Sequence, residues 1–258
     1  MKKFRIAIIS DSHLIKNSTF LGIDTYSSFK AVVDNLVKNI NKYELVLFLG
    51  DMVQDQKNES FDFLNEQLCR IKIKKLLIRG NHDIKKILPI KDFVEYNPPF
   101  SFENWIFIPI ESYKKGAIYG EISSDKIDKI KKILNKKPQS FGILYLHHNL
   151  FETFSPWLDV HITRNFIQIR KELSKITNLK LIISGHIHQY TKNIIGDKVF
   201  LSTPSTSAQF KYSSEEFTLD TINPGYLDLQ LNEDGTHKVQ VLRILGNFGK
   251  PEKNPKTY

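Results

Sequence analysis

Five short runs of apolar residues, rich in isoleucine, leucine and valine, recur along this chain and constrain its fold more than any other feature. The runs are FRIAIIS at 4–10, ELVLFLG at 44–50, KKLLIRG at 74–80, FGILYLH at 141–147 and LKLIISG at 179–185. Runs of this length, bounded by polar or turn residues, are typical of strands buried on both faces of a sheet. We therefore expect an α/β protein.

Between these runs lie segments in which apolar residues recur every three or four positions, as on one face of an amphipathic helix. The segments cover 26–43, 59–71, 123–137 and 163–176. Strands that alternate with helices favour crossover connections in a mostly parallel sheet. The stretch 100–112 alternates less regularly, and the C-terminal third predicts a hairpin that turns at EDGT.

The length of 258 residues is within the range of one α/β domain. We expect a single domain over 1–245, followed by a flexible tail over 246–258, which lacks apolar periodicity. No window approaches the ~18 apolar residues of a membrane span, so no membrane partner is expected. Cys69 is the only cysteine, which excludes an intrachain disulfide and favours a reducing cytoplasm.

Each apolar run ends in residues that can bind a metal or transfer a proton. The endings are Asp11-Ser12-His13, Gly50-Asp51, Gly80-Asn81-His82-Asp83, His147-His148 and Gly185-His186-Ile187-His188. Loops that follow parallel strands gather at one edge of a sheet, so we expect these side chains to converge there. In Asp-x-His and His-x-His, an extended backbone would place both donors on the same side.

Aspartate, histidine and asparagine without cysteine form a mixed oxygen and nitrogen donor set, which suits divalent manganese, iron or zinc. The seven candidate donors are Asp11, His13, Asp51, Asn81, His147, His186 and His188. Seven donors exceed the needs of one tetrahedral ion but suit two ions that share a carboxylate. A histidine beside an apolar segment is also common as a packed core residue; the ordered series of endings favours ligands.

The formal net charge of +9 suggests a nucleic-acid partner, but its composition argues against one. Of the 37 basic residues only six are Arg, the residue preferred for bidentate phosphate and base contacts. The many Lys are spread along predicted helices such as the one at 123–137. A nucleic-acid partner is therefore not expected.

The ordered series of endings resembles the calcineurin-like metallophosphoesterases over roughly residues 4–245. The resemblance implies a four-layer sandwich, in which two mixed β-sheets are flanked by helices. It also implies two divalent ions, either iron, manganese or both, with zinc as a further fit. One ion would be held by Asp11, His13 and His188, the other by Asn81, His147 and His186, with Asp51 bridging.

Three further segments, PWLDVHITRN (156–165), TPSTSAQF (203–210) and EEFTLDTINPGYLDLQLNEDGT (215–236), resemble the bacterial class III cyclic-AMP phosphodiesterases of that superfamily. This resemblance implies hydrolysis of 3',5'-cyclic AMP to 5'-AMP by in-line attack of a metal-bridging hydroxide. One departure is Asn149, which stands where the family usually has proline and leaves the geometry of the His147 loop open.

The resemblance assigns the chemical step to Asp51, Asn81 and His82. His82 suits protonation of the leaving ribose oxygen, with Asp83 or Asp55 orienting its ring, although a structural histidine is the alternative. For Asp83, capping of a helix before IKKIL is the favoured role. His148, Thr206, Phe210 and Trp157 are candidate substrate contacts, each with a structural alternative, and His161 is interpreted as a structural or specificity-loop residue.

Several alternatives stay open at this point. A 2',3'-cyclic nucleotide phosphodiesterase would use the same metals, because the metals grip only the phosphate. The related lipid A precursor pyrophosphatases have Arg where His82 stands, and a nuclease would need a DNA-embracing domain. A non-catalytic phosphate-sensing or protein-binding module would usually have lost ligands. The sequence also leaves open whether the protein is a monomer or a homodimer.

Overall fold

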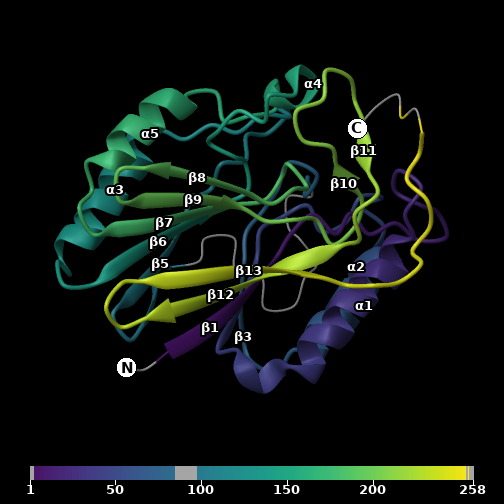
Figure 1. The fold of residues 1–258 in the computed structure, drawn as a ribbon, viewed down its shortest axis with the longest axis horizontal. Helices are drawn as coiled ribbons and strands as arrows, with labels where there is room; N and C mark the ends of the chain where they lie inside the picture. Colours follow the sequence, from purple (N-terminus) through teal and green to yellow (C-terminus); the bar gives the residue numbers. More distant parts are fainter. Residues whose placement is uncertain (1–2, 85–97, 254, 256–258) are drawn as a thin grey trace.

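The computed structural model of the protein describes residues 3–84, 98–253 and 255. Two large mixed β-sheets lie face to face, and helices cover their outer faces (Figure 1). The predicted four-layer α/β sandwich is confirmed.

The first sheet has five strands in the order β13-β12-β1-β2-β3. Its strands are β1 (Lys3–Ile9), β2 (Leu45–Phe48), β3 (Lys74–Leu77), β12 (Gly225–Asn232) and β13 (His237–Arg243). β1, β2 and β3 are parallel, whereas β12 and β13 form the predicted antiparallel hairpin. The N-terminal and C-terminal parts of the chain therefore share one sheet.

The second sheet has six strands in the order β4-β5-β6-β7-β9-β8. Its strands are β4 (Phe100–Phe102), β5 (Trp105–Pro109), β6 (Phe141–Leu146), β7 (Leu179–Ser184), β8 (Thr191–Ile195) and β9 (Lys198–Ser202). β5, β6, β7 and β9 are parallel, and β4 and β8 are antiparallel strands at the two edges. A separate two-stranded sheet pairs β10 (Gln209–Phe210) with β11 (Leu219–Asp220).

The helices form where the sequence predicts them. α1 (Thr25–Lys38), the short 3-10 helix η1 (Ile40–Lys42) and α2 (Asn58–Arg70) belong to the side of the five-stranded sheet, whereas α3 (Ser124–Asn135) and α5 (Phe166–Ser174) cover the six-stranded sheet. Asp24 caps α1, because its side chain accepts a hydrogen bond from the Ser27 backbone N–H at 3.1 Å. A further helix of four residues, which the sequence does not predict, is α4 (Pro156–Asp159).

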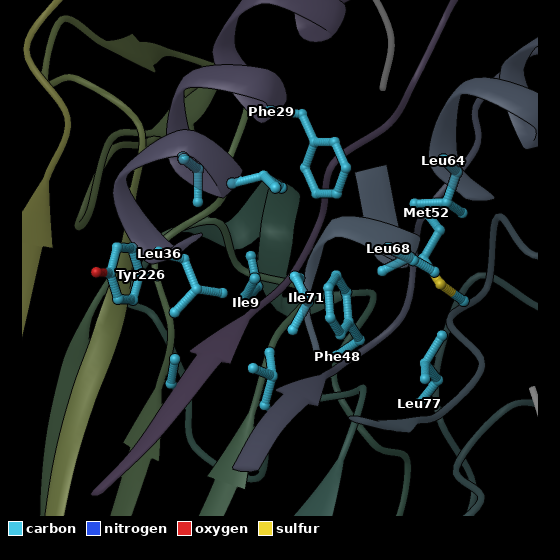
Figure 2. Packing of buried hydrophobic residues seen from close by; sticks show 14 of the residues in the cluster. Ile9, Phe29, Leu36, Phe48, Met52, Leu64, Leu68, Ile71, Leu77 and Tyr226 are labelled. Atoms are coloured by element: carbon cyan, nitrogen blue, oxygen red, sulfur yellow. The ribbon is translucent and has the colours of Figure 1, made fainter. Parts of the chain in front are cut away.

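Of the four apolar clusters among the described residues, three lie between the layers and hold them together. One lies between the two sheets and contains Ile6 and Leu47 from one sheet and Tyr145 and Ile183 from the other. A second lies beneath α3 and α5. Figure 2 shows the third, where side chains of α1 and α2 pack on the outer face of the five-stranded sheet. Because both faces of each sheet are covered, its central strands read as continuous apolar runs.

Part of the predicted tail is attached to the domain. The backbone N–H of Asp24 donates to the Phe248 carbonyl at 2.7 Å, and that of Glu252 donates to the Leu21 carbonyl at 3.1 Å. The Phe248 side chain packs against the core beneath α1. Residues 246–253 are therefore anchored beside the loop that precedes α1. Across the described ranges, no helix has the combination of length and apolarity needed to cross a membrane.

Candidate metal centre

The seven candidate donors come from loops that follow strands of both sheets. Asp11 and His13 follow β1, Asp51 follows β2 and Asn81 follows β3, all in the five-stranded sheet. His147 follows β6, and His186 and His188 follow β7, in the six-stranded sheet. The predicted convergence is therefore found, but it spans the facing edges of two sheets, as the family resemblance implies.

The backbone at most of these donors is not extended. Positive φ angles occur at Asp11 (56°), His13 (42°), Asp51 (52°), His186 (72°) and His188 (51°). The expectation of extended Asp-x-His and His-x-His segments is therefore wrong. Left-handed backbone is uncommon for residues other than glycine and is found where surrounding structure enforces it, often at functional sites.

Close backbone packing explains why glycines precede some of these donors. A Cβ on Gly50, whose φ is +93°, would lie 2.4 Å from the Gly80 backbone nitrogen. A Cβ on Gly185 would lie 2.0 Å from the Ser10 hydroxyl oxygen and 3.0 Å from Asp11 Oδ2. Neither position has room for a side chain, so glycine allows the loops from different strands to approach one another.

One group of donors consists of Asp11, His13 and His188, whose ligand atoms lie within 4.8 Å of one another. His13 Nε2 and His188 Nε2 are 3.0 Å apart, and His188 Nε2 is 3.7 Å from Asp11 Oδ1. All three side chains are fully buried. The Asp11 carboxylate also accepts a hydrogen bond from the His186 backbone N–H at 3.0 Å, which joins the two loops.

A second group contains Asn81, His147 and His186. His147 Nε2 lies 3.0 Å from Asn81 Oδ1 and 3.2 Å from His186 Nδ1. Asp51 lies between the two groups, with Oδ2 at 3.2 Å from His147 Nε2 and 3.8 Å from His13 Nε2. This carboxylate is therefore within reach of both groups.

Three of the histidines are oriented by an outer hydrogen bond from Nδ1–H. His147 donates to the Leu49 carbonyl at 2.6 Å, His188 to the Ala208 carbonyl at 2.8 Å, and His13 to Gln54 Oε1 at 2.8 Å. These bonds fix the tautomer in which Nε2 presents a lone pair to the centre. Aromatic rings also hold two of them: Phe20 stacks on His13, and Phe210 stacks on His188 with ring planes 4° apart.

This arrangement places hydrogen-bond acceptors against acceptors. His13 Nε2 faces His188 Nε2, and His147 Nε2 faces both Asn81 Oδ1 and Asp51 Oδ2. None of the described residues donates a hydrogen bond to Asp51 Oδ2 while His147 keeps this tautomer. Buried acceptors without donors are costly unless a positive charge lies among them. The donor set therefore fits divalent cations.

The pKa values of the centre follow from burial and from the two aspartates. Burial lowers the pKa of His13 to about 3 and raises that of Asp11 to about 7. Burial also acts to lower the pKa of His147, but the Asp51 carboxylate outweighs it and raises this pKa to about 9. A proton on His147 and a metal cation are thus alternative sources of the same positive charge beside Asp51.

His82 lies at the rim of the centre. Its ring is half-buried and meets the His13 ring edge-on, with centroids 4.9 Å apart. Its backbone N–H donates to Asp51 Oδ1 at 2.8 Å. The position therefore combines proximity to the donors with access to solvent.

Asp83 ties the loops of β2 and β3 together. Its buried carboxylate accepts hydrogen bonds from the backbone N–H groups of Asp51, Met52 and Gly80 at 2.8–3.0 Å. The helix that Asp83 is predicted to cap begins at Ile84, and its remaining residues lie outside the described residues. Asp55, the other residue expected to orient His82, accepts hydrogen bonds from Lys16, Lys57 and Ser60.

Three of the predicted substrate contacts are fully buried behind the centre. His148 Nδ1 lies 2.9 Å from the Ser112 hydroxyl, the Thr206 hydroxyl donates to the Ser10 carbonyl, and Phe210 stacks on His188. Trp157 is half-buried, packs against Phe210 and Phe217, and donates from Nε1 to the Ser214 hydroxyl. The geometry favours supporting roles for these residues over direct contact with substrate.

Some supporting residues have no signal in the sequence. Gln54 and Phe20 contact His13, while the hydroxyls of Ser205 and Ser207 both donate to the Asp11 carbonyl. For Ser205 and Ser207, the Ser/Thr-rich segment at 203–207 predicts a turn but does not indicate that the turn contacts Asp11. The Asn149 side chain donates to the Phe151 carbonyl at 2.6 Å, so asparagine closes this loop with its own hydrogen bond.

Comparison with known proteins agrees with this architecture. The family model described as calcineurin-like phosphoesterase matches residues 4–190. The chain belongs to the calcineurin-like phosphoesterase family. The resemblance predicted from the strand endings is thus confirmed. Phosphoesterases of this family use divalent metal ions, which agrees with the donor set of the centre.

Two curated relatives and one solved structure illustrate the similarity. The 3',5'-cyclic adenosine monophosphate phosphodiesterase CpdA of Haemophilus influenzae is 32% identical over 92% of this chain and 88% of its own length. CpdA of Escherichia coli K12 is 30% identical over 99% of this chain and 95% of its own. A dimetal phosphatase from Danio rerio shares the fold, with a TM-score of 0.65 at 10% identity, over 94% of this chain and 99% of its own.

Proposed function

We propose that this protein hydrolyses 3',5'-cyclic AMP to 5'-AMP in a reaction that requires two divalent metal ions. The observation that carries the proposal is the buried cluster of mutually facing acceptors, in a family member that aligns with CpdA over nearly its whole length. A cluster of this kind, at the facing edges of two sheets, can hold metal cations that bind a phosphate group.

In this proposal Asp11, His13 and His188 hold one ion, Asn81, His147 and His186 hold the other, and Asp51 contacts both. Iron and manganese suit the donors best, and zinc also fits. When bound, such a pair of ions lowers the pKa of a bridging water and neutralises charge on the phosphate oxygens. The outer hydrogen bonds from His13, His147 and His188 keep the ligand nitrogens oriented before any ion arrives.

His82 is the residue that we assign to the leaving group. Hydrolysis at the 3' ester forms a bond from a water oxygen to phosphorus and breaks the bond between phosphorus and O3', and the departing O3' takes a proton from His82 in its imidazolium form. The half-buried position of His82 beside His13 supports this role, because the ring is close to the donors and open to solvent. The hydrogen bond from its backbone to Asp51 fixes its place relative to the centre.

The test is a parallel assay of the metal-loaded protein on 3',5'-cyclic AMP and 2',3'-cyclic AMP, with bis-p-nitrophenyl phosphate as a generic diester. We expect 3',5'-cyclic AMP to be the faster cyclic substrate and a chelator to abolish turnover. Faster hydrolysis of the 2',3' isomer would replace the substrate assignment, and full activity of a metal-depleted protein would refute the metal requirement.

A matched pair of histidine variants tests the centre itself. His188→Ala removes a proposed ligand and should lower metal content and turnover together. His237→Ala changes a half-buried histidine on β13, whose partner Leu231 pairs with Phe4 at the start of β1, at the other end of the sheet from the donors. It should leave both quantities unchanged. Normal metal content and turnover in His188→Ala would restore its interpretation as a core histidine.

A further inference from the structure

We propose that His161 contacts the phosphodiester and binds a non-bridging phosphate oxygen beside the donor group that contains His186. The assignment rests on the proposed phosphodiesterase function and adds a second substrate-contacting histidine to it. The sequence alone places His161 only in a structural or specificity loop.

Access to solvent separates His161 from most histidines of the centre. The chain has eight histidines, and the five fully buried ones are His13, His147, His148, His186 and His188. His82, His161 and His237 are half-buried. Of these three, His237 lies at the far end of the five-stranded sheet. A substrate that arrives from solvent therefore meets two imidazoles near the donors, those of His82 and His161.

The two imidazoles flank different donor groups. The His82 ring lies 4.9 Å from the ring of His13, which belongs to the group with Asp11 and His188. The His161 ring lies 5.9 Å from the ring of His186, which belongs to the group with Asn81 and His147. A phosphate held between the two groups would thus have His82 beside one group and His161 beside the other.

The loop that carries His161 is held in place from several directions. The backbone N–H and the hydroxyl of Thr153 both donate to Asp159 Oδ1, at 2.7 and 2.8 Å. The His161 backbone N–H donates to the Leu158 carbonyl at 3.0 Å, and Trp157 is bonded to Ser214. In Figure 1, α4 lies near β10 and β11, in line with these contacts. This anchoring fixes the backbone that carries the imidazole before substrate binds.

The chemistry of the two histidines differs. His82 gives a proton to the leaving oxygen, so its effect depends on how basic that oxygen is. A hydrogen bond from the His161 imidazole N–H to a non-bridging oxygen is charge-assisted and does not involve the leaving group. Its contribution should therefore be the same for substrates with good and poor leaving groups.

The experiment compares His161→Ala, His161→Gln, His82→Ala and the remote control His237→Ala, all metal-loaded, on 3',5'-cyclic AMP and bis-p-nitrophenyl phosphate. We expect His161→Ala to lower kcat/KM about 10- to 100-fold, by the same factor on both substrates, with metal content unchanged. His161→Gln should recover part of the loss through its amide N–H. For His82→Ala the loss should shrink on bis-p-nitrophenyl phosphate, because p-nitrophenolate leaves without a proton.

Three results would overturn the assignment. Normal kcat/KM in His161→Ala would remove the contact. Loss of metal together with activity would mean that His161 acts through His186. A loss confined to cyclic AMP would place His161 at the leaving group or the nucleoside. If the wild-type protein hydrolyses bis-p-nitrophenyl phosphate but not cyclic AMP, the proposed substrate is wrong. The phosphate contact can still be tested in that case: it is supported if His161→Ala keeps the wild-type metal content and loses about 10-fold in kcat/KM on bis-p-nitrophenyl phosphate.

Discussion

Replacing Phe210 by alanine removes the ring that lies against the His188 imidazole, with centroids 4.0 Å apart and planes 4° apart. Phe210 is fully buried and also packs against Trp157 and Phe217. Without it, His188 keeps the hydrogen bond to the Ala208 carbonyl but gains room to tilt away from Asp11 and His13. We expect a loss of folding stability and, separately, a loss of metal affinity.

The two losses can be estimated apart. Truncation of a buried phenylalanine to alanine costs about 3–5 kcal/mol of unfolding free energy. Loss of a group that orients a metal ligand lowers metal affinity about 10- to 100-fold. At saturating metal this reduces the stabilisation by bound metal by about 1.4–2.7 kcal/mol. Phe29→Ala is the matched control, because Phe29 is a fully buried residue of α1 and contacts Phe48 instead of a donor.

The assay is urea unfolding of the wild-type protein and both variants, in chelator and in saturating Mn²⁺. The difference between the two conditions is the stabilisation by metal. It should be the same in Phe29→Ala as in the wild type and smaller by about 1.4–2.7 kcal/mol in Phe210→Ala. An identical metal-dependent gain in both variants would show that stacking by Phe210 does not orient His188.

Two further perturbations have defined outcomes. Asp51→Asn removes the negative charge that lies between His13 and His147, so metal content and turnover should fall together; two full equivalents of metal with near-normal turnover would remove Asp51 from the centre. Hydrogen bonds from Lys180 and Lys198 lower the pKa of Asp197 to about 2. Because the pKa of Asp197 is lower in the folded state, its ion pairs stabilise the fold above the unfolded-state pKa of about 3.9. This stabilisation is lost as the pH falls from 4 toward 2. Asp197 is 55% exposed, so the effect is small, and the stability difference between the wild type and Asp197→Asn should shrink between pH 5 and pH 3. A difference that stays constant would contradict the ion pair.

The four longer helices and the five strands that precede the candidate donors could be predicted, because the pattern of apolar residues that indicates each of them is local in the sequence. α1 buries Phe29, Val32, Val33 and Leu36, which are spaced three and four apart in the sequence. β2 reads as an unbroken apolar run because both of its faces are covered. In each case, the periodicity of a short segment reflects which of its faces is buried.

Other elements lack such a signal. β10 and β11 have two residues each, too few to show a period. The left-handed backbone at Asp11, His13 and Asp51 could not be predicted either, because these residue types adopt extended backbone more readily. It is enforced by hydrogen bonds between loops, such as those from the backbone of Asp11 to Gly50 and of His13 to Asp51.

The sequence by itself determined the candidate donor set, because the ability of a side chain to bind a cation belongs to the residue and not to its surroundings. It also determined that the candidate donors follow buried strands, because each apolar run ends directly before them. Only the tertiary structure decided how these strands are divided between the two sheets, that Phe210 stacks on His188, and that His161 lies beside His186. Those relations join residues far apart in the chain, and their geometry depends on how the two sheets pack, which no local pattern encodes.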